Sequence, residues 1–195
     1  MRVRHGAHRE RSGNARLKGL LKAVAAIDAL SGAAGWCAAW CVLLAVLVSA
    51  GNATVRYGFS IGSNAWLELQ WYLFAVIVLF GASKTLRLNG HVRVDLLYNR
   101  LGPRGQVWLD LVCIAVFLLP ATLLLTWMSW PLFFESWRID EISSNAGGLL
   151  RWPVKLLLPV GFALLTLQGL AEFVRRAAML AGIIPLSTQY QRPVR

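Results

Sequence analysis

The chain has 195 residues, of which 57% are hydrophobic and only 15% are charged, and its formal net charge is +11. Its mean hydropathy is +0.55. Charged residues are missing from two whole blocks, which run from Ala29 to Val55 and from Leu111 to Phe134. About 20 helical residues cross the hydrocarbon of a bilayer, so such runs predict membrane-spanning helices rather than a soluble core. We therefore expect an all-α integral membrane protein.

The first 28 residues form a basic segment that precedes the first uncharged run. Its first dozen residues are polar and repel one another, which predicts disorder, and His5 and His8 are interpreted as part of this solvated tail. From Leu17 onward the spacing of leucine and valine is helical, so we expect an amphipathic lead-in that lies on the membrane surface. The basic residues of the segment are Arg2, Arg4, Arg9, Arg11, Arg16, Lys18 and Lys22.

Four membrane spans are expected, and together they form one membrane domain over residues 29–174. Pro153 suits the first turn of the last span, where a missing N–H costs nothing. Pro120 and Pro159 predict kinks inside the third and fourth spans. Residues 175–195 are then a tail. The expected spans are 29–51, 66–86, 106–134 and 152–174.

Small residues recur every four positions in the first span. Ser31, Gly35 and Ala39 would form a face that lets another helix approach closely. Trp36 and Trp40 form a neighbouring face. We interpret both faces as packing surfaces.

The distribution of basic residues predicts the orientation of the spans. Sixteen of the 20 lysines and arginines lie in the N-terminal segment, in the link between the second and third spans, and in the C-terminal tail. The positive-inside rule then places both termini and this link in the cytoplasm. The same bias explains the basic composition without a nucleic-acid partner. The four basic residues on the other side are Arg56, Arg138, Arg151 and Lys155.

Motifs for catalysis are missing from the sequence. It contains no H-E-x-x-H, no G-x-S-x-G and no glycine loop that would cradle a phosphate. No histidine falls inside an expected span, which removes the usual bis-histidine ligation of a haem. Cys37, Cys41 and Cys113 lie in apolar runs without a nearby histidine, so we interpret them as packing residues. We expect neither an enzyme nor a bound cofactor or metal.

Polar side chains at membrane depth are candidate functional residues, because each costs free energy unless it is paired or hydrated. Lys84 and Asp110 lie near the cytoplasmic ends of the second and third spans. They either form an ion pair that fixes the register of two antiparallel helices or extend separately to the interface. The sequence leaves both alternatives open.

Two further pairs of polar residues lie near span ends. Glu68 at the outer end of the second span could bind an ion or carry a proton, but it has no second deep acid. For Glu68 and Gln70 we therefore favour hydrogen bonding to a partner helix or solvation at the interface. Gln168 and Glu172 share a helix face, and Glu172 is followed one turn later by two arginines, which predicts an ordinary helix-end ion pair.

The link between the second and third spans predicts a turn and a short helix. Asn89-Gly90 supplies the turn, with Gly90 as the residue that can adopt a positive φ. Apolar residues from Val94 to Leu101 have helical spacing, so we expect a short helix in the cytoplasmic interface that stops at Gly102-Pro103. The outer loop over 135–148 either contacts a periplasmic partner or is simply solvated.

Several segments together resemble a known family. They are E-L-Q-W-Y-L-F (68–74), G-A-S-K-T-L-R-L-N-G-H-V-R-V-D (81–95), R-L-G-P-R-G-Q (100–106) and the stretch G-G-L-L-R-W-P-V-K onward (147–172). The chain resembles the small permease subunit, of the DctQ type, of tripartite ATP-independent periplasmic (TRAP) transporters. The G-H-V-R-V-D segment is the most specific part. The motif positions that we carry over are Arg87, Gly90, His91, Arg93, Asp95 and Arg100.

The resemblance implies partners and a role. Family members bind a larger, many-span permease subunit that carries substrate and sodium, and a periplasmic binding protein delivers the substrate, typically an organic acid. The resemblance therefore implies a non-catalytic scaffold subunit in the bacterial inner membrane. The alternatives are a small homo-oligomeric channel or exporter, which would need a polar pore, and the membrane anchor of a redox complex, which would need haem or quinone ligands.

Overall fold

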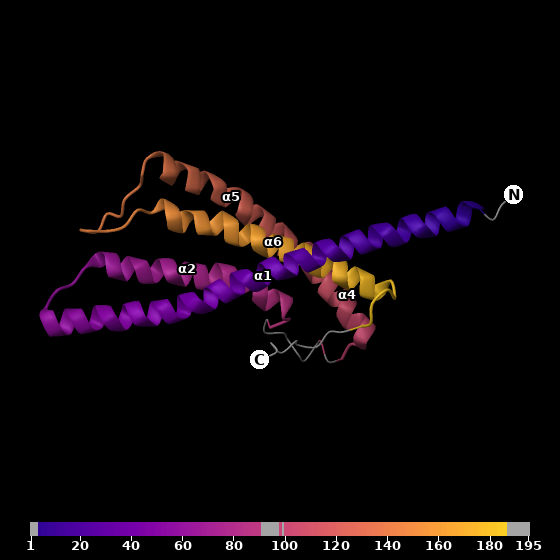
Figure 1. The fold of residues 1–195 in the computed structure, drawn as a ribbon, viewed down its shortest axis with the longest axis horizontal. Helices are drawn as coiled ribbons and strands as arrows, with labels where there is room; N and C mark the ends of the chain where they lie inside the picture. The colour runs from indigo at the N-terminus through magenta and orange to yellow at the C-terminus, as the bar shows by residue number, and fades with distance from the viewer. Residues whose placement is uncertain (1–3, 91–97, 99, 187–195) are drawn as a thin grey trace.

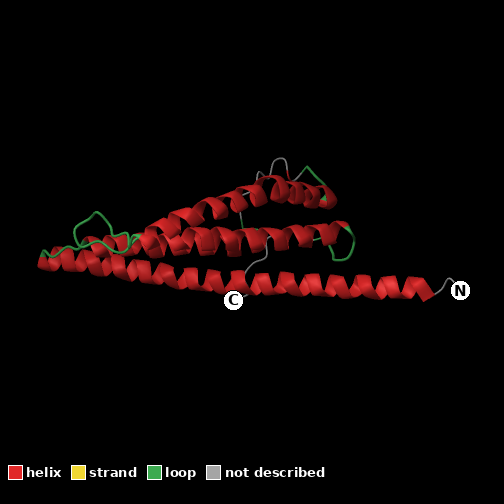
Figure 2. Cartoon of the chain, turned by 90° about the horizontal axis from the view of Figure 1, so that it is seen from above, coloured by secondary structure: helices red, strands yellow, loops and turns green. Residues whose placement is uncertain are grey.

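The structure is a computed structural model that describes residues 4–90, 98 and 100–186, with side chains from residue 19 onward. Helices α1 (Arg4–Phe59) and α2 (Asn64–Arg87) form one hairpin. Helices α5 (Leu119–Arg138) and α6 (Trp152–Leu180) form a second, which α4 (Pro103–Cys113) and the π-helical turn η1 (Ile114–Leu118) extend. The two hairpins cross near the middle of the molecule and diverge toward the end that carries their connecting loops (Figures 1 and 2). We call this the loop end, and the opposite end, which carries the link 88–102, the link end.

Helix α1 is longer than the sequence predicts. Its 56 residues correspond to about 84 Å at 1.5 Å per residue, far more than the roughly 30 Å of membrane hydrocarbon. The predicted disordered start was wrong, because the helix already begins at Arg4 and runs on as one straight rod (Figure 2). The position of the lead-in on the membrane surface stays a prediction. No proline interrupts this stretch, so nothing forces the helix to turn before the first span.

Helix α2 is bounded by residues that satisfy its end groups. The hydroxyl of Ser63 caps its start by accepting from the backbone N–H of Ala65. At its end, Asn89 N–H donates to Leu86 and Gly90 N–H donates to Thr85, as in a Schellman motif. The positive φ of this turn, 54°, belongs to Asn89 and not to Gly90 as predicted. Asparagine tolerates this conformation, and its side chain has a further role described below.

The π-helical turn η1 changes which face of the third span is buried. In η1 the N–H of Leu119 donates to the carbonyl of Ile114, five residues back, immediately before Pro120. This wider turn takes up one extra residue. Buried residues of the span follow one another at intervals of seven residues, except across the π turn, where the interval is eight. The sequence predicted a kink at Pro120, and the structure has a π turn just before it, a rare local irregularity of helices. The buried positions are Val107, Ile114, Thr122, Ser129 and Ser136.

Helix α6 is the central helix of the fold, because it packs against α1, α2, α4, η1 and α5. Pro153 lies in its first turn as predicted, and Pro159 is buried within it. A Cβ atom on Gly161 would lie 2.6 Å from Cβ of Leu79, so α2 and α6 approach each other closely there. The helix also continues to Leu180, six residues beyond the predicted end of the membrane domain.

The buried face of α1 differs slightly from the predicted one. Ser31 and Gly35 are buried, but the next buried residue is Ala38, whereas Ala39 is exposed. Two steps of four residues turn the helix by about 80° beyond two full turns, while a step of seven returns almost to the same face. Trp36 and Trp40 are exposed and pack edge to face against each other with ring centroids 5.8 Å apart.

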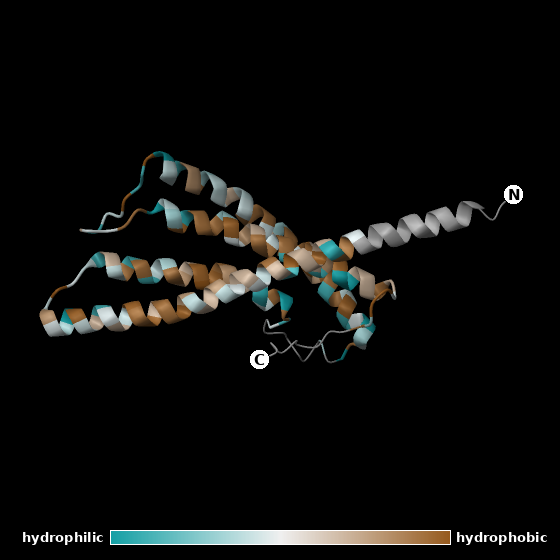
Figure 3. Ribbon diagram, viewed as in Figure 1, coloured by the Kyte–Doolittle hydropathy of each residue, from teal (hydrophilic) through white to brown (hydrophobic). Residues whose placement is uncertain are grey.

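Among the described residues, four helical segments are long and apolar enough to cross a membrane, which confirms the predicted all-α membrane fold. They are 19–59, 64–87, 103–138 and 152–180. Apolar residues cover most of their outer surface, and hydrophilic residues gather at the helix ends and at the crossing of the hairpins (Figure 3). A surface this rich in exposed Trp, Phe, Leu and Val is that of a membrane protein, whose helices face lipid or other membrane helices.

The contact between Gly161 and Leu79 makes a testable prediction. In Gly161→Ala the added methyl group would force α2 and α6 apart, so we expect a loss of about 1–3 kcal/mol in the free energy of unfolding in detergent. Gly81→Ala is the matched control, because a Cβ atom there meets nothing within 4 Å. An equal effect of the two substitutions would contradict the close packing of the hairpins.

Candidate functional site: a charge network at the helix crossing

A cluster of charged and polar side chains lies where the hairpins cross. It contains three carboxylates and three guanidinium groups from four helices, and we call it the charge network. Asp28 comes from α1, Arg87 from α2, Asp110 from α4, and Glu172, Arg175 and Arg176 from α6. Ser31, Asn89 and Gln168 complete the network with neutral side chains.

Glu172 is the centre of the network. Its carboxylate is only 1% exposed and accepts hydrogen bonds from Arg175, through one oxygen, and from Arg176, through the other. The sequence predicted such a helix-end ion pair. The structure places it inside the protein, because the side chain of Arg176 is only 4% exposed. A buried charge without a partner is very costly, so these residues depend on one another.

Arg176 connects α6 to α4 and to the turn after α2. Its Nε lies 3.2 Å from Oδ2 of Asp110. Its Nη2 donates to Oδ1 of Asn89 at 2.6 Å. Asn89 therefore supplies both the left-handed turn and an acceptor for a buried guanidinium, which glycine could not do. The hydroxyl of Tyr98 also donates to Asp110, at 3.3 Å.

Of the two alternatives left open for Lys84 and Asp110, the structure does not form the ion pair. Asp110 has Arg176 as its partner, and the aliphatic stem of Lys84 packs against Gly35 of α1 so closely that a Cβ atom there would overlap it. The physical reason is the position of α6. Its arginines reach the region between α2 and α4 from the centre of the bundle, so Asp110 finds its cation there.

Asp28 connects α1 to α6 of the other hairpin and to α2 of its own. Its carboxylate binds Arg175 of α6 at 2.5 Å, and Arg87 of α2 donates to its backbone carbonyl at 2.9 Å. Gln168 donates to Oδ1 of Asp28 at 3.0 Å and accepts from the hydroxyl of Ser31 at 2.7 Å. Because Gln168 and Ser31 are both fully buried, each satisfies a polar group that water does not reach.

The charge network is suited to holding helices in register. Its three negative and three positive groups balance, and the geometry joins α1, α2, α4 and α6 at one level. Within the described part of the chain, no group of three or more His, Cys, Asp and Glu side chains could hold a metal ion. The carboxylates instead face arginines, which are always protonated and cannot act as proton carriers.

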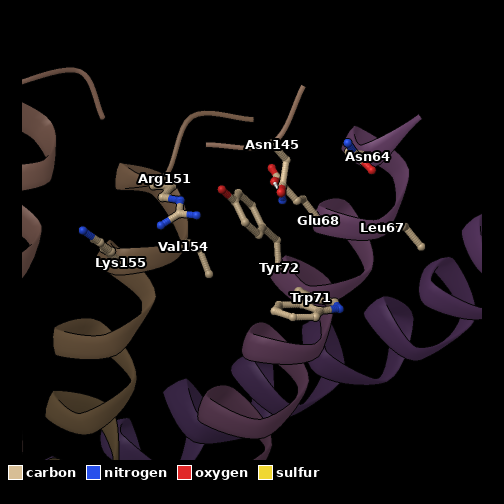
Figure 4. A pocket seen from close by; sticks show the side chains of 9 residues that line it. All are labelled: Asn64, Leu67, Glu68, Trp71, Tyr72, Asn145, Arg151, Val154 and Lys155. Carbon is tan, nitrogen blue, oxygen red and sulfur yellow. Dashed lines mark hydrogen bonds between the residues drawn. The ribbon is translucent and has the colours of Figure 1, made fainter. Parts of the chain in front are cut away.

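A second polar cluster lies at the loop end, around Glu68 of α2. Its carboxylate accepts from the backbone N–H of Leu149 at 2.7 Å, from Asn145 Nδ2 at 2.8 Å and from the hydroxyl of Ser143. Figure 4 shows Asn145 next to Glu68. For Glu68 the sequence favours hydrogen bonding to a partner helix or solvation at the interface. In the structure its hydrogen-bond donors come from the loop between α5 and α6, so its carboxylate anchors that loop.

The same loop is closed by backbone and ionic contacts. Ile142 and Leu150 form an isolated antiparallel bridge, and Glu141 binds Lys155 and, at 3.7 Å, Arg151. The hydrogen bond from Lys155 lowers the pKa of Glu141 below its ordinary value of 4.5. The loop is therefore an ordered structure held by the first turns of α2 and α6.

The other predicted site residues are placed as follows. Gln70 lines a groove between α1 and α2, next to Ser49 and Phe74. Gly90 ends the turn after α2, and Arg100 is exposed just before α4. His91, Arg93 and Asp95, together with most of the predicted interfacial helix, lie outside the described residues. Pro103 begins α4.

Asp28 is a member of the charge network that was not singled out from the sequence. It is the last charged residue before the first uncharged run, which marks a charge at the edge of a span, where pairing is favoured. This signal does not say which helices Asp28 joins.

The network predicts a large effect of removing one charge. In Arg176→Gln, Glu172 loses one of its two guanidinium partners and Asp110 loses its guanidinium, so we expect a loss of about 3–5 kcal/mol in the free energy of unfolding. The control is Arg104→Gln, which removes an exposed charge of α4 at the same end. Chemical unfolding of both variants in the same detergent measures the difference. A loss below about 1 kcal/mol, the range of surface ion pairs, would contradict the buried network.

The ion pair of Glu141 predicts a dependence on pH. Because its pKa is lowered in the folded chain, its stabilising effect is present above pH 4.5 and is lost as the pH falls through the folded value. We therefore expect Glu141→Gln to lower the melting temperature at neutral pH, with the difference shrinking toward acid pH. Glu135→Gln, at an exposed position of α5, is the control. A difference that stays constant with pH would contradict this role of Glu141.

Comparison with known proteins identifies the family. The family model for the DctQ component of tripartite ATP-independent periplasmic transporters matches residues 45–179, which is more than half of the chain. A protein of Haemophilus influenzae named "Putative TRAP transporter small permease protein" is 36% identical over 76 residues, which cover 39% of this chain and 47% of that relative. The match thus spans about half the length of this relative. No solved structure matches the chain. The matched region contains α2, α4, η1, α5 and most of α6. It also contains both polar clusters, except for Asp28 and Ser31. The chain therefore belongs to the DctQ family of small permease subunits of TRAP transporters.

Proposed function

We propose that this chain is a non-catalytic scaffold subunit of a sodium-coupled TRAP transporter. It would support the large permease subunit during uptake of an organic acid that a periplasmic binding protein delivers. The observation that carries the proposal is the charge network. Its buried carboxylates and guanidinium groups are bound to one another across four helices, as expected for a part that holds its shape while a partner moves.

The outer surface supports a role beside a larger membrane partner. Large apolar side chains of α1, η1 and α5 are exposed, among them Trp36, Trp40, Phe117 and Trp127. Lipid can cover such faces, but so can the helices of a second subunit, which would pack against them by van der Waals contact. The proposed large permease subunit would bury part of this surface.

The polar residues of the third span speak against the channel alternative. Thr122 and Thr126 donate their hydroxyl hydrogens to the carbonyls of Leu118 and Thr122, at 2.9 and 2.7 Å, and Ser129 does the same toward Leu125. These hydroxyls are therefore bound within α5 itself. A polar pore would need such groups to face a shared aqueous path.

Transport assays test the proposed role. Under a sodium gradient directed into the liposomes, the chain alone should take up no organic acid. The chain co-expressed with the large permease subunit should copurify with it and, with the binding protein, support uptake. Arg176→Gln should lose copurification, and Arg104→Gln should keep it. Uptake by the small chain alone, or equal uptake by the large subunit without it, would contradict the proposal.

The proposed location is the bacterial inner membrane, with both termini in the cytoplasm. It is supported by the concentration of lysine and arginine at the link end. Reporter fusions test it. A fusion at residue 195 should report a cytoplasmic position, and a fusion inserted after Asn145 in the loop should report a periplasmic one. The opposite result at either position would contradict the orientation.

A further inference from the structure

A pocket at the loop end has no role in the account above. It has a volume of about 500 Å³ and lies between the first turns of α2 and α6, beneath the loop that Glu68 anchors (Figure 4). We call it the loop-end pocket. The lining residues that matter here are Leu67, Glu68, Trp71, Arg151, Val154 and Lys155.

The pocket changes from polar to apolar along the helices. Its charged residues come from the first two turns of α2 and from the start of α6, where a spanning helix meets the membrane interface. Trp71, Leu67 and Val154 form its apolar part, and Figure 4 shows Trp71 deeper along α2 than Glu68. Trp71 is 77% exposed, so its indole ring offers a large free apolar surface. A polar upper part and an apolar lower part at this depth match the two parts of an amphiphile.

The two walls of the pocket carry opposite charges. On the α2 side, Glu68 is held in place by its three donors from the loop. On the α6 side, Lys155 is bound to Glu141, but the side chain of Arg151 is 42% exposed and its ion contact with Glu141 is 3.7 Å long. Within the described residues, no hydrogen bond occupies the donors of this guanidinium. It faces Tyr72 across the opening between α6 and α2 (Figure 4).

We propose that the loop-end pocket binds a phospholipid with a zwitterionic, ethanolamine-type head group. The phosphate would accept hydrogen bonds from Arg151, since guanidinium groups bind phosphate in a bidentate manner. The ammonium group would lie toward Glu68, and the first methylene groups of an acyl chain would cover Leu67, Trp71 and Val154. The two carboxylates and two cations nearby cancel, which favours a head group without net charge over an anionic one.

Such a lipid would fill the space that the diverging hairpins leave at the loop end. The hairpins approach closely at Gly161 and are joined by the charge network at the link end. At the loop end they are connected mainly through the loop, for example by the hydrogen bond from Tyr72 to the carbonyl of Leu150 at 2.7 Å. A lipid bound to Arg151 and Trp71 would then fix the separation of α2 and α6. This inference does not depend on the transport role.

Native mass spectrometry of the full chain tests the proposal. The protein, delipidated in detergent, would be mixed with phosphatidylethanolamine, with phosphatidylglycerol of the same acyl chains, or with inorganic phosphate. We expect one tightly held phosphatidylethanolamine, weaker retention of phosphatidylglycerol, and no competition by millimolar phosphate. Arg151→Gln should lower retention by roughly tenfold or more, because a charge-assisted hydrogen bond is lost. Arg138→Gln, at an exposed position outside the pocket, should retain the lipid like the unaltered chain.

Two further measurements make the outcome decisive. Trp71→Ala alters only an exposed side chain, so it should fold normally and hold the lipid less tightly. Phosphatidylethanolamine should raise the melting temperature of the unaltered chain more than phosphatidylglycerol does. Equal binding of the two lipids, equal retention by Arg151→Gln and Arg138→Gln, or displacement of the lipid by inorganic phosphate would each overturn the proposal. Displacement would show a free-anion site instead.

Discussion

The carboxylate of Glu172 and the two guanidinium groups bound to it lie inside a bundle of membrane helices, where an unpaired charge would be very costly. This constraint organises the link end. Arg175 and Arg176 must find further partners, and Asp28, Asp110 and Asn89 provide them from α1, α4 and the turn after α2. Because each partner comes from a different helix, satisfying the charges of α6 fixes the positions of the others.

Three other features of the fold are consistent with the crossing of the two hairpins at the charge network. The turn after α2 uses asparagine at a position that usually favours glycine, since its side chain must reach Arg176. The π turn before Pro120 shifts the buried face of the third span by one residue, so that α5 continues to pack on α6 toward the loop end. At that end a second carboxylate, Glu68, orders the connecting loop. The molecule thus has a polar junction of four helices at one end and an ordered loop at the other.

Much of the fold could be predicted from the sequence, because membrane spans depend on local composition. The uncharged runs and the position of Pro153 predicted the four spans, and the spacing of Glu172 and Arg176 predicted a local ion pair. Contacts between distant segments could not be read in this way. The partner of Asp110 depends on which helix occupies the centre of the bundle, and the anchoring role of Glu68 depends on a loop more than 70 residues away. The shift from Ala39 to Ala38 shows that even a local pattern drifts when its period differs from that of the helix.

The central claim is that the buried charges fix the angle between the two hairpins. The most direct test is a distance measurement by pulsed electron spin resonance between spin labels at Tyr57 and Trp137, two exposed positions on different hairpins at the loop end, in a chain whose three cysteines are replaced. The account predicts one narrow distance distribution that broadens strongly when Arg176 is replaced by glutamine. A distribution of unchanged width in that variant would contradict it.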